Sequence, residues 1–340
     1  MSELRFNPIT KKWSVIASER GQNRNIFIAG KVSADTPCPF CDKDGGINKT
    51  LRRICSVNLE GSDYPAMIVT PNRYPALGIE GDINRKGCGI YDSSAAIGAH
   101  EVVIDSYRHG IDISGYTEDE LNNLFTAFKW RICDLEKDIR FRHIAAFKNI
   151  GEAAGEIINH PHAQIIAFPF ISENVERSVE TADRYYKEKE RCIYCDMLEQ
   201  ELRDRKRVVF ENYEFAAFAP YASLSPFEIS VFPKKHTSCF RSASEGVIRQ
   251  LADITKEVFG RLASLLGAPA VTMALRIPPF KDNRPDFKGF MANIENSFHW
   301  HLEIRPVIAK ASINTWAANV HINPVKPEDA AKYLREVNPI

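Results

Sequence analysis

The sequence has no net charge, no long apolar run and no hydrophobic leader. Its 44 basic residues balance its 44 acidic residues, so attraction to a nucleic acid polymer through charge alone is not expected. No segment approaches the roughly 18 consecutive apolar residues of a membrane-spanning helix, and the first residues lack the apolar stretch of a secretory signal. We therefore expect a cytoplasmic protein that binds neither nucleic acid polymers nor membranes.

Low-complexity segments are also missing, and the composition is that of a globular protein. Hydrophobic residues make up 44% of the chain and charged residues 26%, which excludes an extensively disordered chain. At about 150 residues per domain, the length predicts about two domains with a core that needs no disulfides.

Eight cysteines are present, and their spacing favours metal ligands over disulfides. Four of them form two Cys-x-x-Cys pairs, and the others (Cys55, Cys88, Cys133 and Cys239) stand singly. In a chain without a leader, paired cysteines at this spacing are typical of metal sites, and single cysteines are typical of free thiols.

The chain repeats one plan twice, which predicts a duplicated fold. Each half has a Cys-x-x-Cys pair, a histidine at the end of a β-rich run, an amphipathic helix and a His-x-His motif. The motifs are Cys38 to Cys41 and His160-Pro-His162 in the first half, and Cys192 to Cys195 and His299-Trp-His301 in the second. We predict an α+β fold of two similar modules, residues 1–172 and 173–340, each an antiparallel sheet with outer helices. The polar stretch 173–191 fits either a linker or a helix.

Two helices are predicted by capping signals and apolar periodicity. Thr117 and Glu120 have the spacing of a capping box, and apolar residues at helical period follow up to Leu135. The second helix starts near Ser244 and stops at Gly267, a residue typical of helix C-termini. A third helix is predicted from Pro327 to about residue 337.

The repeated cysteines and histidines predict two structural zinc sites, because zinc prefers four sulfur or nitrogen ligands in a tetrahedron. The expected ligands are Cys38, Cys41, His109 and His160 in the first half, and Cys192, Cys195, His236 and His299 in the second. A redox role for each Cys-x-x-Cys is the alternative. Which histidine of each His-x-His motif binds metal is left open by the spacing.

The His160-Pro-His162-Ala-Gln164 motif is the candidate catalytic element. Residues two apart on an extended segment share a face, so one histidine can hold metal while His162 faces substrate. A neutral imidazole is a competent nucleophile near pH 7 and suits covalent phosphoryl transfer. Gln164 can donate its amide hydrogen to a phosphate oxygen.

Motifs along nearly the whole chain resemble the galactose-1-phosphate uridylyltransferase family of the histidine-triad superfamily, including its relatives that act on ADP-glucose with phosphate. They are Arg5-Phe-Asn-Pro-Ile-Thr-Lys-Lys-Trp13 with Arg20 and Arg24, Cys38-Pro-Phe-Cys41, Asn72-Arg-Tyr-Pro-Ala-Leu77, Phe147-Lys-Asn149 with Gly151, His160-Pro-His-Ala-Gln164, Phe298-His-Trp-His301 and Ile322-Asn-Pro-Val-Lys-Pro-Glu-Asp-Ala-Ala331.

The resemblance implies a ping-pong nucleotidyltransferase that acts on a nucleotide sugar and a sugar 1-phosphate. His162 then matches the nucleophile that forms a nucleotidyl-histidine, Gln164 the residue that stabilises the transferring phosphoryl group, and His160 a zinc ligand. Asn72, Asn149 and Gly151 match substrate contacts. Arg20 and Arg24 match arginines that reach a neighbouring subunit, which implies a homodimer.

Three departures from the family pattern concern the substrate and the second half. Ile157, preceded by Glu156, stands where a small polar residue is usual, and the segment 312–319 replaces a hexose-recognition segment. Arg276 stands where iron-containing members have a histidine, which favours zinc. UDP-glucose with galactose 1-phosphate is the expected substrate pair. The alternatives are a nucleotide-sugar phosphorylase or hydrolase and, from another class, a catalytically silent zinc-stabilised nucleotide-binding protein.

Overall fold

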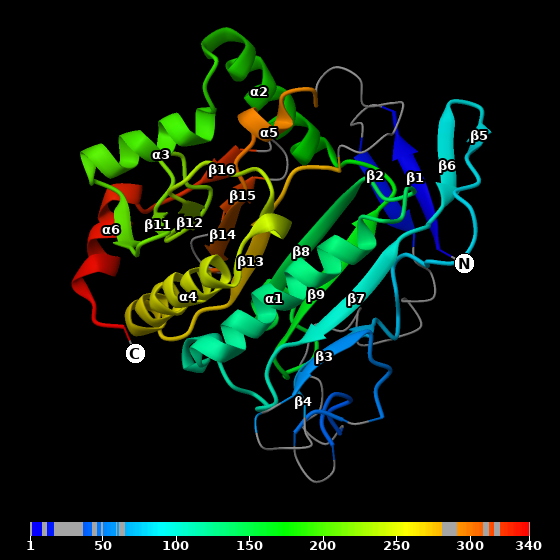
Figure 1. Cartoon of the computed structure of the whole chain (residues 1–340), viewed down its shortest axis with the longest axis horizontal. Helices are drawn as coiled ribbons and strands as arrows, with labels where there is room; N and C mark the ends of the chain where they lie inside the picture. The colour runs from blue at the N-terminus through cyan, green and yellow to red at the C-terminus, as the bar shows by residue number, and fades with distance from the viewer. Residues whose placement is uncertain are drawn as a thin grey trace.

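The computed structural model describes residues 2–8, 12–16, 37–42, 46–48, 50–58, 60, 65–280, 291–308, 313–315 and 320–339. Its main feature is one ten-stranded antiparallel sheet (Figure 1). In spatial order the strands are β10 (Val208–Glu211), β11 (Phe215–Phe218), β12 (Ile229–Pro233), β14 (His301–Pro306), β13 (Val271–Arg276), β8 (His143–Ile150), β9 (His162–Phe168), β7 (Ala99–Ile104), β4 (Pro65–Pro71) and β3 (Cys55–Asn58).

The order of these strands confirms the predicted duplication. Outward from the centre, one half runs β8, β9, β7, β4, β3 and the other runs β13, β14, β12, β11, β10. Each position in one half therefore has a counterpart in the other. The two half-sheets are joined because β8 pairs antiparallel with β13, with Phe147 opposite Ala274. The predicted α+β class is confirmed, and the two half-sheets form one continuous sheet.

Helices α1 (Glu118–Leu135) and α4 (Glu245–Leu266) lie side by side on one face of the sheet (Figure 1). The predicted capping box is present, because Thr117 accepts from the Glu120 backbone N–H while the Glu120 carboxylate accepts from Thr117 N–H. Ser244 caps α4, and Gly267 ends it with a φ of 70°. The main apolar core lies between these two helices and the sheet.

The remaining elements surround the large sheet. A four-stranded sheet contains β2 (Lys12–Ile16), β1 (Glu3–Asn7), β6 (Tyr91–Ala95) and β5 (Lys86–Cys88), and a hairpin contains β15 (Ile313–Thr315) and β16 (Val320–Ile322). The other α-helices are α2 (Glu173–Lys189), α3 (Ile193–Asp204), α5 (Ile294–Ser297) and α6 (Pro327–Glu336). The polar stretch after residue 172 is thus helical. No helix in the described ranges is long and apolar enough to cross a bilayer.

The second face of the large sheet carries the polar side chains of β9. Along β9, Ala163, Ile165 and Ala167 are buried, while His162 and Gln164 are only partly buried. Because side chains alternate between the two faces of a strand, His162 and Gln164 point away from α1 and α4. The fold therefore places the predicted catalytic motif on the face opposite the helices.

Candidate functional site

The first predicted ligand set comes together from three separate segments. Cys38 and Cys41 lie in one tight turn, His109 follows β7 and His160 precedes β9; their ligand atoms all lie within 4.8 Å of one another. Cys41 Sγ is 3.3 Å from Nδ1 of both histidines, and Cys38 Sγ is 3.7 Å from Nδ1 of His160. Ligands of a tetrahedral zinc ion are about 3.3–3.8 Å apart, so the donor set fits this metal.

His160, rather than His162, is the member of its His-x-His motif that faces the cysteines. Its Nε2 lies 3.0 Å from the Ser106 carbonyl oxygen, so Nε2–H donates there and Nδ1 is left for a metal. Burial lowers the pKa of His160 to about 4. The ring is therefore neutral at pH 7, which is the form that binds metal.

The second predicted ligand set also comes together, in the second half of the chain. The ligand atoms of Cys192, Cys195, His236 and His299 all lie within 4.8 Å of one another. Cys195 Sγ lies 3.1 Å from Nδ1 of His236 and 3.5 Å from Nδ1 of His299. Burial lowers the pKa of His299 to about 3, so this ring is also neutral at pH 7. Both halves therefore hold a metal-capable site of the same composition.

His162 has the geometry of a nitrogen nucleophile. Its Nδ1 lies 2.8 Å from the backbone oxygen of His160, so Nδ1–H donates to that carbonyl and the lone pair is at Nε2. Burial lowers the pKa of His162 and keeps the ring neutral near pH 7. The ring of Phe40, from the cysteine turn, packs edge-on against the His162 ring, with 5.6 Å between the ring centroids. His162 can therefore attack an electrophile through Nε2.

Gln164 is oriented by His100, a residue of β7. The Ala76 backbone N–H donates to Nδ1 of His100 over 3.1 Å, so in the neutral ring Nε2 carries the proton. That Nε2 lies 2.9 Å from Oε1 of Gln164 and 3.0 Å from Nδ2 of Asn72. The amide oxygen of Gln164 is thereby fixed, and its NH₂ group is directed elsewhere. This places a neutral hydrogen-bond donor on the same face as His162.

Asn149 and Gly151 lie where β8 leads into the loop before His160. Gly151 has a φ of 80°, and its N–H donates to Oε2 of Glu156 over 2.6 Å. Burial raises the pKa of Glu156. Ile157 is 46% exposed, so its side chain does not fill the core. Arg20 and Arg24, which were expected to bind substrate, lie outside the described residues.

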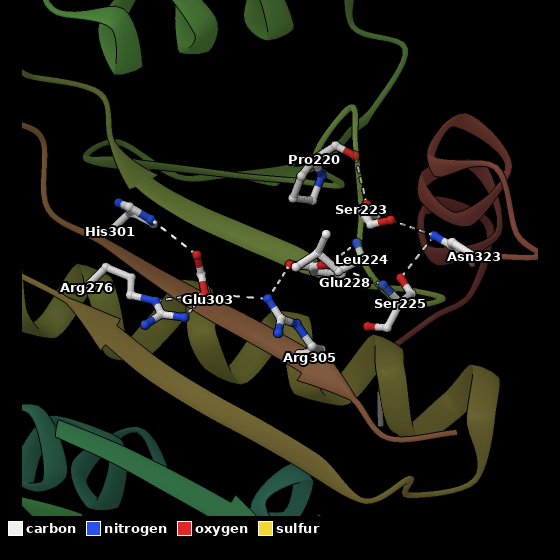
Figure 2. Close-up of polar contacts among 10 residues, drawn as sticks. All are labelled: Pro220, Ser223, Leu224, Ser225, Glu228, Arg276, His301, Glu303, Arg305 and Asn323. Atoms are coloured by element: carbon white, nitrogen blue, oxygen red, sulfur yellow. Dashed lines mark hydrogen bonds and ion pairs between the residues drawn. The ribbon is translucent and has the colours of Figure 1, made fainter. Parts of the chain in front are cut away.

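The second half repeats the histidine geometry with different neighbours, and Figure 2 shows Glu303 and Arg276 beside His301. His301 Nδ1 lies 3.0 Å from the His299 carbonyl oxygen, as His162 does with His160. Its Nε2, however, lies 3.6 Å from a carboxylate oxygen of Glu303. Arg276 donates to the other oxygen of Glu303 over 2.8 and 2.6 Å. An internal ion pair thus occupies the place corresponding to Gln164 and its surroundings.

Comparison with known proteins places the chain in a family. The galactose-1-phosphate uridylyltransferase of Thermotoga maritima is 30% identical over 345 residues, which cover 99% of this chain and 98% of the relative. The chain belongs to the galactose-1-phosphate uridylyltransferase family. The predicted resemblance is confirmed.

A relative with a different named activity also aligns along nearly the whole chain. The ADP-glucose phosphorylase of Arabidopsis thaliana is 27% identical over 342 residues, covering 99% of this chain and 93% of the relative. A crystal structure of an ADP-glucose phosphorylase from Arabidopsis thaliana with bound ADP-glucose matches with a TM-score of 0.74 at 26% identity, covering 99% and 100% of the two chains.

Two further matches concern the fold and one segment. A structure of uridylyltransferase superposes with a TM-score of 0.79 at 24% identity and covers 98% of this chain and 97% of that one, which supports the shared fold. The model of a family described as "Domain of unknown function (DUF4931) N-terminal domain" matches residues 95–171. That segment contains β7, α1, β8 and β9, the elements around His162.

Within this uridylyltransferase family member, the sequence interpretation missed three side chains near the site. His100, Asp105 and Lys148 were not among the predicted site residues. A signal for His100 was available, because it is one of two polar residues, with Glu101, inside the fully buried run of β7. Lys148 is likewise a charged residue within the alternating pattern of β8, on its buried face.

Proposed function

We propose that the protein transfers a nucleotide between a nucleotide sugar and a sugar 1-phosphate, with UDP-glucose and galactose 1-phosphate as the favoured pair, and that His162 carries the nucleotide. The observation that carries the proposal is the hydrogen bond from His162 Nδ1 to the His160 carbonyl. It leaves the nucleophilic lone pair at Nε2, on the face that also holds Gln164.

The proposed reaction has two displacements at one phosphorus atom. Nε2 of His162 attacks the α-phosphorus, a P–N bond forms, and the P–O bond to the sugar 1-phosphate breaks with its electron pair leaving on oxygen. An oxygen of the second sugar 1-phosphate then attacks phosphorus, and the P–N electron pair returns to Nε2. The His160 carbonyl accepts from the nucleotidyl-imidazolium formed in between, and the Gln164 amide donates to a non-bridging oxygen.

Substrate binding is assigned to residues around this centre. Asn72, Asn149 and Gly151 are proposed to contact the nucleotide and its phosphates, as the family resemblance implies. Asn72 is supported by its place beside the His100 ring, and Gly151 by the loop that leads to His160. Arg20 and Arg24 are proposed to reach the site of a neighbouring subunit, which makes the protein a homodimer.

Zinc is proposed for both metal-capable sites, held by the two sets of two cysteines and two histidines described above. Bound zinc would crosslink each cysteine turn to the ends of the neighbouring strands, as structural zinc does. In the first half this crosslink includes His160, whose carbonyl orients His162. We place the module boundary at 1–172 and 173–340, so that each module contains one such site.

The second half is proposed to have no catalytic role. A phosphate that approached His301 Nε2 would meet the Glu303 carboxylate 3.6 Å away. Like charges at such a distance repel, and the guanidinium of Arg276 is already paired with the same carboxylate. This half keeps the fold and the metal-capable site.

A phosphorylase reaction is the second candidate function. It is favoured by the relative whose structure holds ADP-glucose and aligns along the whole chain. In that reaction inorganic phosphate replaces the second sugar 1-phosphate, and the first displacement at His162 is unchanged. Water as acceptor would make the protein a hydrolase. A silent nucleotide-binding protein would show neither displacement.

The test is the intact mass of the protein after brief incubation with UDP-glucose, UDP-galactose or ADP-glucose. A gain of one nucleotidyl group that is absent in His162→Ala supports the proposal and identifies the base. His301→Ala is the matched control, because it removes a histidine of the same local geometry and should still form the adduct. Release of the adduct by galactose 1-phosphate, phosphate or water then distinguishes transferase, phosphorylase and hydrolase. No adduct with any donor would contradict the proposal.

A further inference from the structure

A buried ion pair lies directly beneath the strand that carries His162. The side chain of Lys148 is 3% exposed and that of Asp105 is fully buried. Lys148 Nζ donates to the two oxygens of Asp105 over 3.0 and 2.9 Å and to the hydroxyl of Tyr116 over 3.1 Å. The Tyr116 hydroxyl in turn donates to Asp105 over 3.0 Å. The three side chains form a closed network on the helix-covered side of the sheet.

The network also contacts the proposed nucleophile. Lys148 Nζ donates to the backbone oxygen of His162 over 3.2 Å. The residue is therefore held at two points: its carbonyl by Lys148 on one side of the sheet, and its ring Nδ1 by the His160 carbonyl on the other. These bonds together fix the start of β9 and the direction of Nε2.

The second half provides an internal comparison because its strands follow the same plan. Phe147 lies opposite Gln164 and Ala274 opposite Glu303, so Lys148 corresponds to Leu275. Val102 lies opposite Gln164 and Ser230 opposite Glu303, so Asp105, three residues further on, corresponds to Pro233. Tyr116 and Ala243 each precede the N-cap of a long helix.

All three network positions are thus apolar in the half that lacks the nucleophile. Leu275 is buried in the main core, and Ala243 belongs to the same core. The sheet and its covering helix therefore pack at these positions without an ion pair. Because burying two charges carries a desolvation penalty that apolar side chains avoid, packing alone does not account for the pair in the first half.

We infer that Lys148, held by Asp105 and Tyr116, is a positioning residue for the nucleotidyl transfer: it fixes the backbone of His162 so that Nε2 meets the α-phosphorus in line. The inference rests on the proposed role of His162. Small displacements of a reacting group are costly, since a shift of about 1 Å can reduce a rate roughly 10²-fold. The network contacts the backbone of His162 and, among the described residues, none of the side chains proposed to bind substrate. Its loss should therefore slow adduct formation without weakening donor binding.

The experiment compares two ways of removing the ion pair. Lys148→Met alone leaves the Asp105 carboxylate buried and unpaired, so a fall in stability is expected. Lys148→Met with Asp105→Asn removes both charges and keeps an acceptor for Tyr116, so the melting temperature should recover towards that of the wild type. The single-turnover rate of nucleotidyl-enzyme formation should stay reduced, by roughly 10- to 100-fold, in both variants. Donor binding should be unchanged.

A second buried ion pair in the same half is the matched control. Arg131 and Glu101 are 8% and 6% exposed, joined over 2.7 Å, and also lie between the sheet and α1. Neither side chain has a recorded contact with His162 among the described residues. Arg131→Met with Glu101→Gln should therefore leave the rate of adduct formation close to that of the wild type, whatever the change in melting temperature.

The possible outcomes separate this inference from the proposed function. If the wild type forms no adduct, the role of His162 fails, whatever the variants do. If the wild type forms it and the Lys148→Met, Asp105→Asn protein does so within about threefold of the wild-type rate, the positioning role is overturned. An equal loss of rate in the Arg131 and Glu101 control would also overturn it, because the effect would then be general loosening of the half.

Discussion

The side chain and the backbone of His160 face different partners, and the backbone partner is His162. The His160 ring lies with two cysteines and His109 in a metal-capable cluster, while its carbonyl oxygen accepts the Nδ1–H of His162 over 2.8 Å. The metal-capable cluster and the proposed nucleophile are thus joined through one residue. Any change that moves His160 is expected to change the direction of His162 Nε2.

The first prediction follows from this link and concerns metal removal. Cys38→Ser should lower the bound zinc from two equivalents to one and slow adduct formation at His162. Loss of partners that orient a metal-site residue typically costs about 10- to 100-fold in activity, and the same range is expected here. Metal content by elemental analysis and single-turnover kinetics check it.

Cys239→Ser, which removes a thiol outside both clusters, should keep two zinc ions and the wild-type rate. A metal-depleted Cys38→Ser protein with full activity would disprove the link.

A second prediction uses the difference between Gln164 and Glu303. Gln164→Ala removes the neutral donor proposed for the phosphoryl oxygen, and removal of one such donor typically reduces kcat by about 10²- to 10³-fold. Gln164→Glu should reduce it further, because it copies the carboxylate of the second half and repels the incoming phosphate. Steady-state kcat for the two variants checks the order of the effects. Equal activity of Gln164→Glu and wild type would show that Gln164 does not face the phosphoryl group.

A third prediction is that the stability of the folded protein depends on pH through His143, a buried histidine. Burial lowers its pKa to about 4, against an ordinary value of about 6.5 in the unfolded chain. Between these values the unfolded chain binds the proton and the folded chain does not, so stability falls as the pH falls from 6.5 towards 4. The slope from this residue is at most about 1.4 kcal/mol per pH unit. His143→Gln, which keeps a donor for the Ile277 carbonyl, should show a shallower loss in urea unfolding at pH 6.5, 5.5 and 4.5. Parallel curves for the two proteins would contradict the assignment.

Much of the fold and both ligand sets could be predicted from the sequence because the signals are local or repeated. The capping box at Thr117 and the C-terminal Gly267 depend on neighbours along the chain. The order of cysteines and histidines occurs twice, so each half supports the interpretation of the other. Spacing alone could not select His160 over His162 as the metal-facing residue, because residues two apart on a strand share a face; the family resemblance supplied that choice.

The long-range polar contacts could not be predicted in this way. His100 and Gln164 are 64 residues apart, and Lys148 and Asp105 are 43 apart. Their contacts depend on which strands are neighbours and in which register, and no local pattern contains that information. The joining of the two half-sheets through β8 and β13 was missed for the same reason. The contact between Arg276 and Glu303 likewise depends on the register of β13 against β14.

The last prediction concerns the turn that leads from β8 towards His160. Gly151 has a φ of 80°, and an added Cβ would lie 3.0 Å from Ala270 Cβ. Gly267 has a φ of 70° and open space around it, so Gly267→Ala should lose about 1 kcal/mol from backbone strain alone and keep its activity. Gly151→Ala should lose more stability, because strain and a close contact add, and should slow adduct formation, because the displaced loop carries His160. Urea unfolding and single-turnover rates on both variants check it. If Gly151→Ala matched Gly267→Ala in both measurements, the approach of Ala270 would not constrain the loop.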